Sequence, residues 1–236
     1  PCLVDLTGDG RLDLVYGTDA GPLQYCVNTG SLAVPVWTVN TSLFGGVLDV
    51  GGASSPFFYD FDGDGDLDLV SGSQLGDIKY YENTGTVAAP AWRADHAYFA
   101  SIDHSIYSAI TLGDVNADGL ADAVVGDLNG QLFFHPNTGS GFAYDGTVFA
   151  GVDLGDWSVP RFVDMDGDLD LDLVAGNEAG QLTYLANQGT LAAPVWVVVP
   201  GYFGGLDVGS NCSPTLSDYD HDGDQDLITG NISHVV

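Results

Sequence analysis

Basic residues are almost absent from this sequence. Four Lys and Arg stand against 33 Asp and Glu in 236 residues, which gives a formal net charge of −29. A protein that binds nucleic acid needs a basic surface to meet the phosphates, so we exclude nucleic acid as a partner. The chain also has no apolar run of 18 residues, no signal peptide and no N-terminal Met. We therefore expect a mature or excised soluble piece that does not insert into membranes.

Signatures of catalysis are missing too. The five histidines follow no metal-ligand spacing, and neither a Gly-x-Ser-x-Gly nor a His-Glu-x-x-His motif occurs. The aspartates form many close pairs, but their repetition indicates metal ligation rather than one acid–base pair. We predict that the chain is not an enzyme; the alternative is a polysaccharide lyase or hydrolase. One lead toward such an activity is the group Asp95, His96, Asp103 and His104, for which a solvated linker is the simpler interpretation.

The acidic residues gather in five similar loops. Each loop has an oxygen-bearing side chain at positions 1, 3, 5 and 9, usually with glycine at position 6, and the loops hold 21 of the 33 acids. Like charges packed so closely repel each other unless a cation or protons offset them. The loops span residues 5–13, 60–68, 114–122, 164–172 and 218–226.

Oxygen ligands at alternate positions of a tight loop favour Ca²⁺, which takes about 6–8 hard oxygen donors in a tolerant geometry. Mg²⁺ requires an octahedron and keeps its waters, and Zn²⁺ prefers Cys and His, which the repeated positions lack. We therefore predict up to five calcium sites. Their predicted ligands are Asp5, Thr7, Asp9 and Asp13; Asp60, Asp62, Asp64 and Asp68; Asp114, Asn116, Asp118 and Asp122; Asp164, Asp166, Asp168 and Asp172; and Asp218, Asp220, Asp222 and Asp226.

The loops are not EF-hands. The bidentate glutamate at position 12 is missing, and a glycine stands twelve residues after the first Asp of every loop, as at Gly17 and Gly72. The segment that leads to this glycine is short and rich in Val, Leu and Ile, for example Asp68-Leu-Val-Ser-Gly72. Such a segment predicts a strand rather than an exiting helix.

The same period extends beyond the loops. Asparagines that begin Asn-x-Gly turns stand 23 residues after the first Asp of four loops, at Asn28, Asn83, Asn137 and Asn187. Tryptophans stand 32 residues after it in three repeats, at Trp37, Trp92 and Trp196. Each repeat divides into four short strands, which in the second repeat we place at 56–59, 67–71, 78–82 and 91–94.

Four antiparallel strands in each repeat predict an all-β fold, a β-propeller of four-stranded blades. We expect one domain over residues 1–236, with four complete blades and a partial fifth. The repeats span about 1–54, 55–108, 109–157, 158–212 and 213–236. The aligned tryptophans are interpreted first as packing between blades.

These motifs resemble the FG-GAP/VCBS family of calcium-binding propeller repeats, found in integrin α-subunit heads. The resemblance rests on Asp-x-Asp-x-Asp-Gly-x-x-Asp-Leu-Val-x-Gly and the following Asn-x-Gly, and it covers the whole chain. It implies one Ca²⁺ between the first two strands of a blade, and extracellular adhesion, ligand binding or a structural role more often than catalysis. The second and fifth loops match best. Thr7 is a weak donor and Leu169 replaces the turn glycine, so we expect a distorted fourth turn and the weakest sites in the first and fourth loops.

Two kinds of modification are also predicted. The sequons at Asn40, Asn211 and Asn231 are candidates for N-glycosylation, with Asn40 the strongest. Three cysteines cannot all pair internally, and Cys26 fits a buried apolar position. A closed ring would bring the segments of Cys2 and Cys212 together, so a disulfide between them is a hypothesis.

The sequence stops soon after the second strand of the fifth repeat, which leaves an unfinished blade with an open edge. The chain could belong to a longer propeller, close on a short blade, or receive strands from another chain and so build a filament. We expect a calcium-stabilised extracellular structural or adhesion module, with self-assembly through that blade as one option. A carbohydrate-binding propeller is the alternative. The expected partners of the protein are calcium, a second copy of the chain, another extracellular protein or a glycan.

Overall fold

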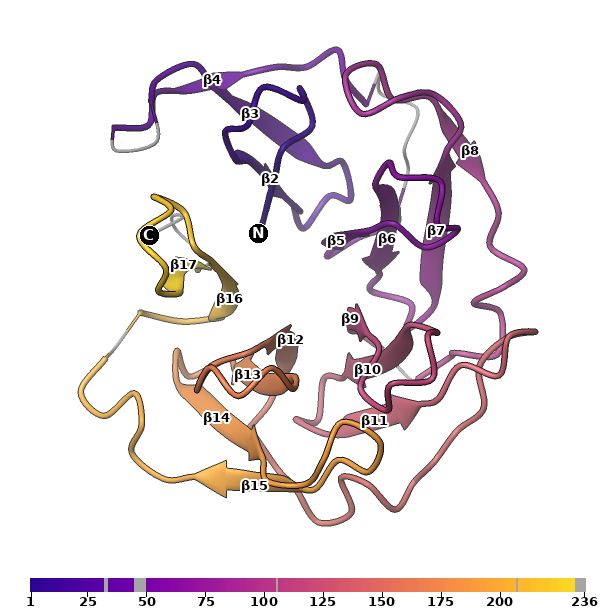
Figure 1. The fold of residues 1–236 in the computed structure, drawn as a ribbon, viewed down its shortest axis with the longest axis vertical. Helices are drawn as coiled ribbons and strands as arrows, with labels where there is room; N and C mark the ends of the chain where they lie inside the picture. The colour runs from indigo at the N-terminus through magenta and orange to yellow at the C-terminus, as the bar shows by residue number, and fades with distance from the viewer. Residues whose placement is uncertain (32–33, 45–49, 105, 207, 232–236) are drawn as a thin grey trace.

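The computed structural model describes residues 1–31, 34–44, 50–104, 106–206 and 208–231. Five antiparallel sheets surround a central axis, and the chain visits them in order around the ring (Figure 1). Within the described part of the chain, no helix has the length and apolar character needed to span a membrane. The prediction of an all-β propeller is confirmed.

Each sheet consists of consecutive strands, and the first strand of each lies closest to the axis (Figure 1). The first sheet has β1 (Cys2–Val4), β2 (Asp13–Tyr16), β3 (Gln24–Asn28) and β4 (Trp37–Val39). The second has β5 (Ser55–Tyr59), β6 (Asp68–Gly72), β7 (Ile78–Asn83) and β8 (Trp92–Ala94). The third has β9 (Ala109–Gly113), β10 (Asp122–Gly126) and β11 (Leu132–His135). The fourth has β12 (Val159–Val163), β13 (Asp172–Gly176), β14 (Leu182–Asn187) and β15 (Trp196–Val199), and the fifth has β16 (Ser213–Ser217) and β17 (Asp226–Gly230).

The ring is closed through the fifth sheet. The innermost strands contact each other in the order β1, β5, β9, β12, β16, and β16 contacts β1. Tyr219, which follows β16, lies against Trp37 of the first blade, with ring centroids 6.4 Å apart. Its hydroxyl also accepts a hydrogen bond of 2.9 Å from Nδ2 of Asn28. Side-chain contacts therefore join the last blade to the first.

The third and fifth sheets depart from four strands. In the third, the outer strand is reduced to two isolated bridges, Phe134 with Asp145 and Asn137 with Phe142. The complete sheets begin this strand with Trp37, Trp92 and Trp196, and the third repeat has no Trp there. The fifth sheet has two strands in the described residues, and residues 232–236 lie outside them.

The hydrophobic cores lie between neighbouring sheets. Leu69 on β6 is in one cluster with Val15 on β2 and Tyr25 on β3, so the second sheet covers the first. Similar clusters join the later pairs of sheets. Both faces of the second strand are covered, so β6, β10 and β13 are buried along their whole length.

The aligned tryptophans take part in this packing, as predicted. The ring of Trp92 lies 6.0 Å from that of Phe44, which precedes the second blade. The ring of Trp196 lies 5.8 Å from that of Phe149, which precedes the fourth blade. Offset aromatic pairs at such distances add stabilisation beyond their buried area.

The repeated glycine at the end of the second strand permits the closest contact between blades. A Cβ added to Gly72 would lie 2.0 Å from the carbonyl oxygen of Ser108, at the entrance to the third blade. The serine hydroxyl fastens the same junction, because Ser108 Oγ accepts from Ser73 N at 3.0 Å and donates to Asp77 O at 3.1 Å. Ser54 and Ser158 hold the equivalent positions.

Cys212 occupies this serine position at the fourth junction. A Cβ on Gly176 would meet the Cys212 carbonyl oxygen at 2.3 Å, as in the serine junctions. Cys2, Cys26 and Cys212 are all buried free thiols, so the hypothesised Cys2–Cys212 disulfide is absent from the structure. Burial raises the pKa of Cys212 to about 11. Cys212 stands at a position that the first three junctions fill with serine, and this explains its presence there without a disulfide.

Arg161 links the innermost strands of three blades. Its side chain is buried, and Nη1 donates to the carbonyl oxygens of Ile110 on β9 (3.1 Å) and Pro160 (2.9 Å). Nη2 donates to the carbonyl oxygen of Pro56 on β5 at 3.5 Å. In the described part of the chain no carboxylate lies within ion-pair distance of Arg161. Its role is thus to satisfy carbonyl groups on strand edges that no further strand pairs.

The close contact at the glycine gives a first prediction. Gly72→Ala should lower the free energy of unfolding by more than about 2 kcal/mol, because a methyl group would push two blades apart. Gly151→Ala is the matched control: Gly151 has φ of 82° and open space around an added Cβ. It should cost only about 1 kcal/mol for the left-handed backbone. Equal losses in urea unfolding would contradict the close-contact explanation.

Candidate metal centres

The five acidic loops occupy equivalent places in the fold. Each joins the innermost strand of a sheet to the second strand, as residues 60–68 join β5 to β6. The innermost strands are arranged around one axis, so the loops project from the same end of the ring. The sequence prediction of a loop between the first two strands is confirmed.

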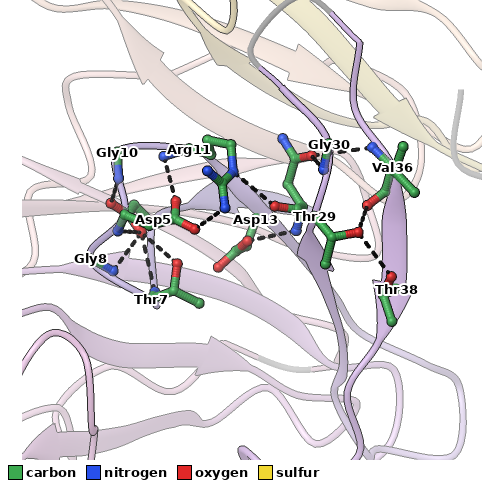
Figure 2. A network of polar contacts seen from close by, with 12 residues as sticks. Asp5, Thr7, Gly8, Gly10, Arg11, Asp13, Thr29, Gly30, Val36 and Thr38 are labelled. Atoms are coloured by element: carbon green, nitrogen blue, oxygen red, sulfur yellow. Dashed lines mark hydrogen bonds and ion pairs between the residues drawn. The ribbon is translucent and has the colours of Figure 1, made fainter.

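The first Asp of each loop shapes the turn. Asp5 Oδ1 accepts the N–H of Gly8 at 2.7 Å, and Oδ2 accepts that of Gly10 at 2.8 Å (Figure 2). The bond to the N–H at position 6 recurs in all five loops, at 2.8–3.2 Å. The Asp at position 5 accepts the N–H at position 7 at 2.9–3.1 Å in every loop. Backbone amides thus hold both carboxylates at the turn.

The prediction that Leu169 distorts the fourth turn is wrong. The φ of Leu169 is 76°, close to the 81–98° of the four glycines at position 6, and its N–H keeps the bond to Asp164 Oδ2 at 3.1 Å. Position 4 is also left-handed in every loop, including Ala117 and His221, with φ of 58° and 62°. A side chain in this region costs conformational energy, so the loop network imposes the turn on residues that disfavour it.

The Asp at position 9 connects the loop to the third strand. Asp13 is fully buried; its Oδ1 accepts the N–H of Asn28 at 2.8 Å and its Oδ2 the hydroxyl of Tyr25 at 2.6 Å. Asp68 and Asp172 make the same pair of bonds, to Asn83 and Tyr80 and to Asn187 and Tyr184.

The third blade lacks one partner of this carboxylate. Phe134 stands where the other three blades have Tyr25, Tyr80 and Tyr184. Asp122 Oδ1 accepts the N–H of Asn137 at 2.8 Å, but Asp122 Oδ2 is buried without a hydrogen-bond partner among the described residues. Burial raises the pKa of Asp122 to about 6.

Carboxylates converge in three of the loops. In the second loop, oxygen atoms of Asp60, Asp62 and Asp64 lie within 4.8 Å of one another. In the fourth and fifth loops, positions 1, 3 and 9 converge in the same way. The members are Asp164, Asp166 and Asp172, and Asp218, Asp220 and Asp226.

The first and third loops are different at position 3. Thr7 and Asn116 supply a hydroxyl and an amide oxygen there in place of a carboxylate. In the first loop the Arg11 guanidinium also forms an ion pair with Asp9 and donates to the carbonyl oxygen of Asn28 at 3.0 Å (Figure 2). Arg11 would therefore compete with a cation for Asp9.

Buried carboxylate oxygens without partners are the best evidence that the loops fit a cation. In the described part of the chain, Asp66 Oδ1, Asp170 Oδ1 and Asp218 Oδ1 have no hydrogen-bond partner, like Asp122 Oδ2. Asp66 and Asp170 are each only 7% exposed. Burial, with the charge of Asp168, raises the pKa of Asp170 to about 6. An unsatisfied buried acceptor costs free energy, and a hard cation at the loop would offset that cost.

Asp66 and Asp170 stand at position 7 and were not among the predicted ligands. The signal was present, because in the second, fourth and fifth loops Asp continues at every second residue from position 1 to position 9. The structure adds Asp66 and Asp170 to the candidate donor set.

Three residues of the third-repeat group, His96, Asp103 and His104, each contact a different residue. His96 Nδ1 accepts the N–H of Tyr80 at 3.1 Å. The backbone of Asp103 forms an isolated antiparallel β-bridge with that of Asp77. His104 Nε2 lies 2.6 Å from Nε2 of His135. Burial, together with His104, lowers the pKa of His135 to about 4, so the two rings form a neutral pair at pH 7.

The three sequons differ in accessibility. Asn40 is half-buried, and its Oδ1 accepts Ser42 N at 2.9 Å and Ser42 Oγ at 2.7 Å. Asn231 Nδ2 donates to the carbonyl oxygen of Val208 at 2.8 Å, and the Ser of its sequon lies outside the described residues. Asn211 has a buried Oδ1. Glycosylation at these residues stays a prediction.

Comparison with known proteins concerns the repeat and the fold. A profile of the FG-GAP-like repeat matches residues 5–71 and 60–125. No curated protein matches the chain. Among solved structures, the chain is similar to an Agrocybe aegerita lectin that recognises non-reducing terminal N-acetylglucosamine, with a TM-score of 0.45, 20% identity, and coverage of 99% of this chain and 61% of the lectin.

A second similar structure is the Photorhabdus luminescens Tc holotoxin pore. Its TM-score is 0.41 at 21% identity, and the alignment covers 97% of this chain and 11% of the toxin chain. The chain therefore spans about three fifths of the length of the lectin and a small part of the toxin.

The strained turn of the fourth loop gives a second prediction. Leu169→Gly should raise the free energy of unfolding by about 1 kcal/mol, because glycine adopts the left-handed conformation without steric cost. The exposed Leu169 side chain makes little contribution to a core, so little packing is lost. Leu120→Gly, at the exposed position that follows the third-loop glycine, is the control and should not stabilise. Chemical unfolding in EDTA measures both.

The missing tyrosine gives a third prediction. Phe134→Tyr should raise the free energy of unfolding of metal-free protein by about 1–2 kcal/mol at pH 7.5, because the hydroxyl would bond Asp122 Oδ2. The folded pKa of Asp122 is raised to about 6 in the present chain, so protonation stabilises its folded state as pH falls through 6 toward 4. The advantage of the variant should therefore shrink at pH 5. A gain that is equal at both pH values would contradict this role of Asp122.

Proposed function

Because the chain belongs to the FG-GAP-like repeat family, we propose that it is a calcium-stabilised extracellular module with a structural or adhesive role. The observation that carries this proposal is the set of buried, unpartnered carboxylate oxygens in four of the five loops. Their donor chemistry, oxygen alone with several carboxylates, is that of a calcium site rather than a zinc site.

The residues that would hold the ion differ between loops. In the second loop they are Asp60, Asp62 and Asp64, with Asp66 as a further donor. The fourth and fifth loops offer the converging carboxylates described above. A bound divalent cation would offset the repulsion between these carboxylates. The position-9 Asp holds the loop to the third strand, so an ion there would stabilise the whole blade.

The extracellular setting is supported by the type of site. These loops lack the bidentate glutamate that closes an EF-hand, and sites of modest affinity suit the calcium concentrations met by extracellular modules. Asn40 adds a half-buried sequon that fits a secreted glycoprotein.

Adhesion through strand addition belongs to the same proposal. In the described residues β17 pairs only with β16, so one edge of the fifth sheet has no strand beside it. Such an edge can accept a strand from a second copy or from another extracellular protein. Mass that rises with protein concentration in analytical ultracentrifugation would support self-association. The absence of enzymatic activity stays a prediction, which turnover of an acidic polysaccharide would contradict.

Calcium removal is the fourth prediction. Excess EDTA should lower the melting temperature by several degrees relative to millimolar Ca²⁺, because an ion that binds only the folded state stabilises it by about 2.7 kcal/mol per site at 100 times Kd. Mg²⁺ should restore little of this difference.

Two variants test whether the loops are responsible. Asp62→Asn should reduce the calcium-dependent rise, because it removes a carboxylate from the converging group of the second loop. Asp156→Asn, an exposed Asp outside the loops, is the matched control and should keep the full rise. A melting temperature of the unmodified chain that is the same in Ca²⁺ and EDTA would defeat the proposal.

A further inference from the structure

A pocket of about 500 Å³ opens at the end of the ring opposite the acidic loops. Its lining includes the first residues of the innermost strands, such as Ser55, Ala109 and Val159, whereas each loop follows the last residue of such a strand. The volume lies in the range of small-molecule sites. The pocket thus belongs to a part of the molecule that the candidate metal centres do not use.

In each of the four turns that enter the second to fifth blades, one residue at the same repeat position lines this pocket. Ala53, Tyr107, Trp157 and Asn211 each stand two residues before an innermost strand, and each has a left-handed backbone, with φ of 49°, 58°, 60° and 61°. Asn tolerates this conformation, but bulky aromatic residues rarely adopt it. The surrounding structure imposes it here, because Tyr107 N donates to Gln74 O at 3.1 Å and Trp157 N to Leu128 O at 2.9 Å, both in the preceding blade.

The two strained aromatic residues form a platform. Tyr107 and Trp157 are stacked, with ring centroids 4.5 Å apart and 24° between their planes. Both are half-buried and line the pocket. Tyr107 is also held by Gln74, whose Nε2 donates to its hydroxyl at 2.8 Å. The hydroxyl proton is then left to donate to a bound molecule.

Two residues that line the same pocket offer hydrogen-bond acceptors. Asn211 Oδ1 is buried and has no hydrogen-bond partner in the described residues, although Asn211 lines the pocket. Asp19 adds an exposed carboxylate. A ligand with several hydroxyl groups would satisfy these acceptors and receive the Tyr107 proton.

Charge narrows the class of ligand. Asp19 is the one charged side chain among the described residues that line the pocket, and no Lys, Arg or His side chain is among them. Arg161 directs its guanidinium at strand carbonyl groups instead. An acidic ligand would therefore meet the Asp19 carboxylate and no basic side chain among these residues.

We propose that this pocket binds a neutral sugar ring, with its C–H face on the Tyr107–Trp157 platform and its hydroxyl groups on Asn211 and Asp19. A pyranose presents one apolar face and a rim of hydroxyl groups, which matches an aromatic platform ringed by polar atoms. The proposal goes beyond a structural role and does not rest on calcium binding, because the metal loops lie at the other end of the ring.

Saturation-transfer NMR on the full chain in Ca²⁺ tests this proposal. The probes are glucose, galactose, mannose, fucose, N-acetylglucosamine and N-acetylgalactosamine at millimolar concentration, with glucuronate and glucosamine as charged comparisons. At least one neutral sugar should bind and change the tryptophan fluorescence. Trp157→Gly should weaken that binding about tenfold, since a stacking contact is lost. Its melting temperature should not fall by more than a few degrees, because glycine relieves the strain of φ near 60°.

Tyr144→Ala is the matched control, because Tyr144 is an exposed aromatic residue outside the pocket and should keep full sugar binding. Should Trp157→Gly unfold, Asn211→Gly takes its place, since Asn211 has the same backbone conformation, and it must also weaken binding. The proposal is overturned if none of the six neutral sugars binds, if binding survives the substitution, or if glucuronate or glucosamine binds more tightly than every neutral sugar.

Discussion

Each complete blade depends on a buried carboxylate at the ninth position of its acidic loop. In the first blade, Asp13 accepts a hydrogen bond from the N–H of Asn28 on the third strand and from the hydroxyl of Tyr25. Asn28 Oδ1 in turn accepts the N–H of Gly30 at 3.0 Å and of Val36 at 3.2 Å, which fixes the turn to the fourth strand. One charge thus links the loop between the first two strands to the third and fourth, and its loss would leave several buried donors unpaired.

This arrangement leaves negative charge that a bound cation would offset. A buried carboxylate is tolerated only when hydrogen bonds or an opposite charge compensate it, and the loops add further carboxylates within a few ångströms. Backbone amides satisfy part of this charge, as Gly8 and Gly10 do for Asp5. Asp66, Asp122, Asp170 and Asp218 keep oxygens that no protein donor reaches in the described residues. A divalent ion would supply the positive charge that these carboxylate oxygens lack.

The sequence predicts what is repeated and misses what occurs once. In the second blade no end of a predicted strand differs from β5 to β8 by more than one residue, because strand, turn and glycine signals recur at fixed offsets. Arg161 carries no such signal, since its partners on β5 and β9 are 105 and 51 residues away. The Leu169 turn was misjudged because local preference was weighed without the network that overrides it. The shortened outer strand of the third blade coincides with a missing Trp, which the sequence showed without indicating its structural effect.

The side chains at equivalent repeat positions are similar at one end of the ring and different at the other. At the loop end, the same backbone carries nearly the same side chains in every blade, which is what a shared stabilising role requires. At the pocket end, the backbone is again the same, but Ala53, Tyr107, Trp157 and Asn211 differ in every property except φ. Equal geometry with unequal chemistry lets a rigid scaffold present one asymmetric surface from equivalent turns. Tyr107 N donates to Gln74 O at 3.1 Å and Trp157 N to Leu128 O at 2.9 Å, so the shared backbone holds each blade to the preceding one, and the side chains are left free to differ.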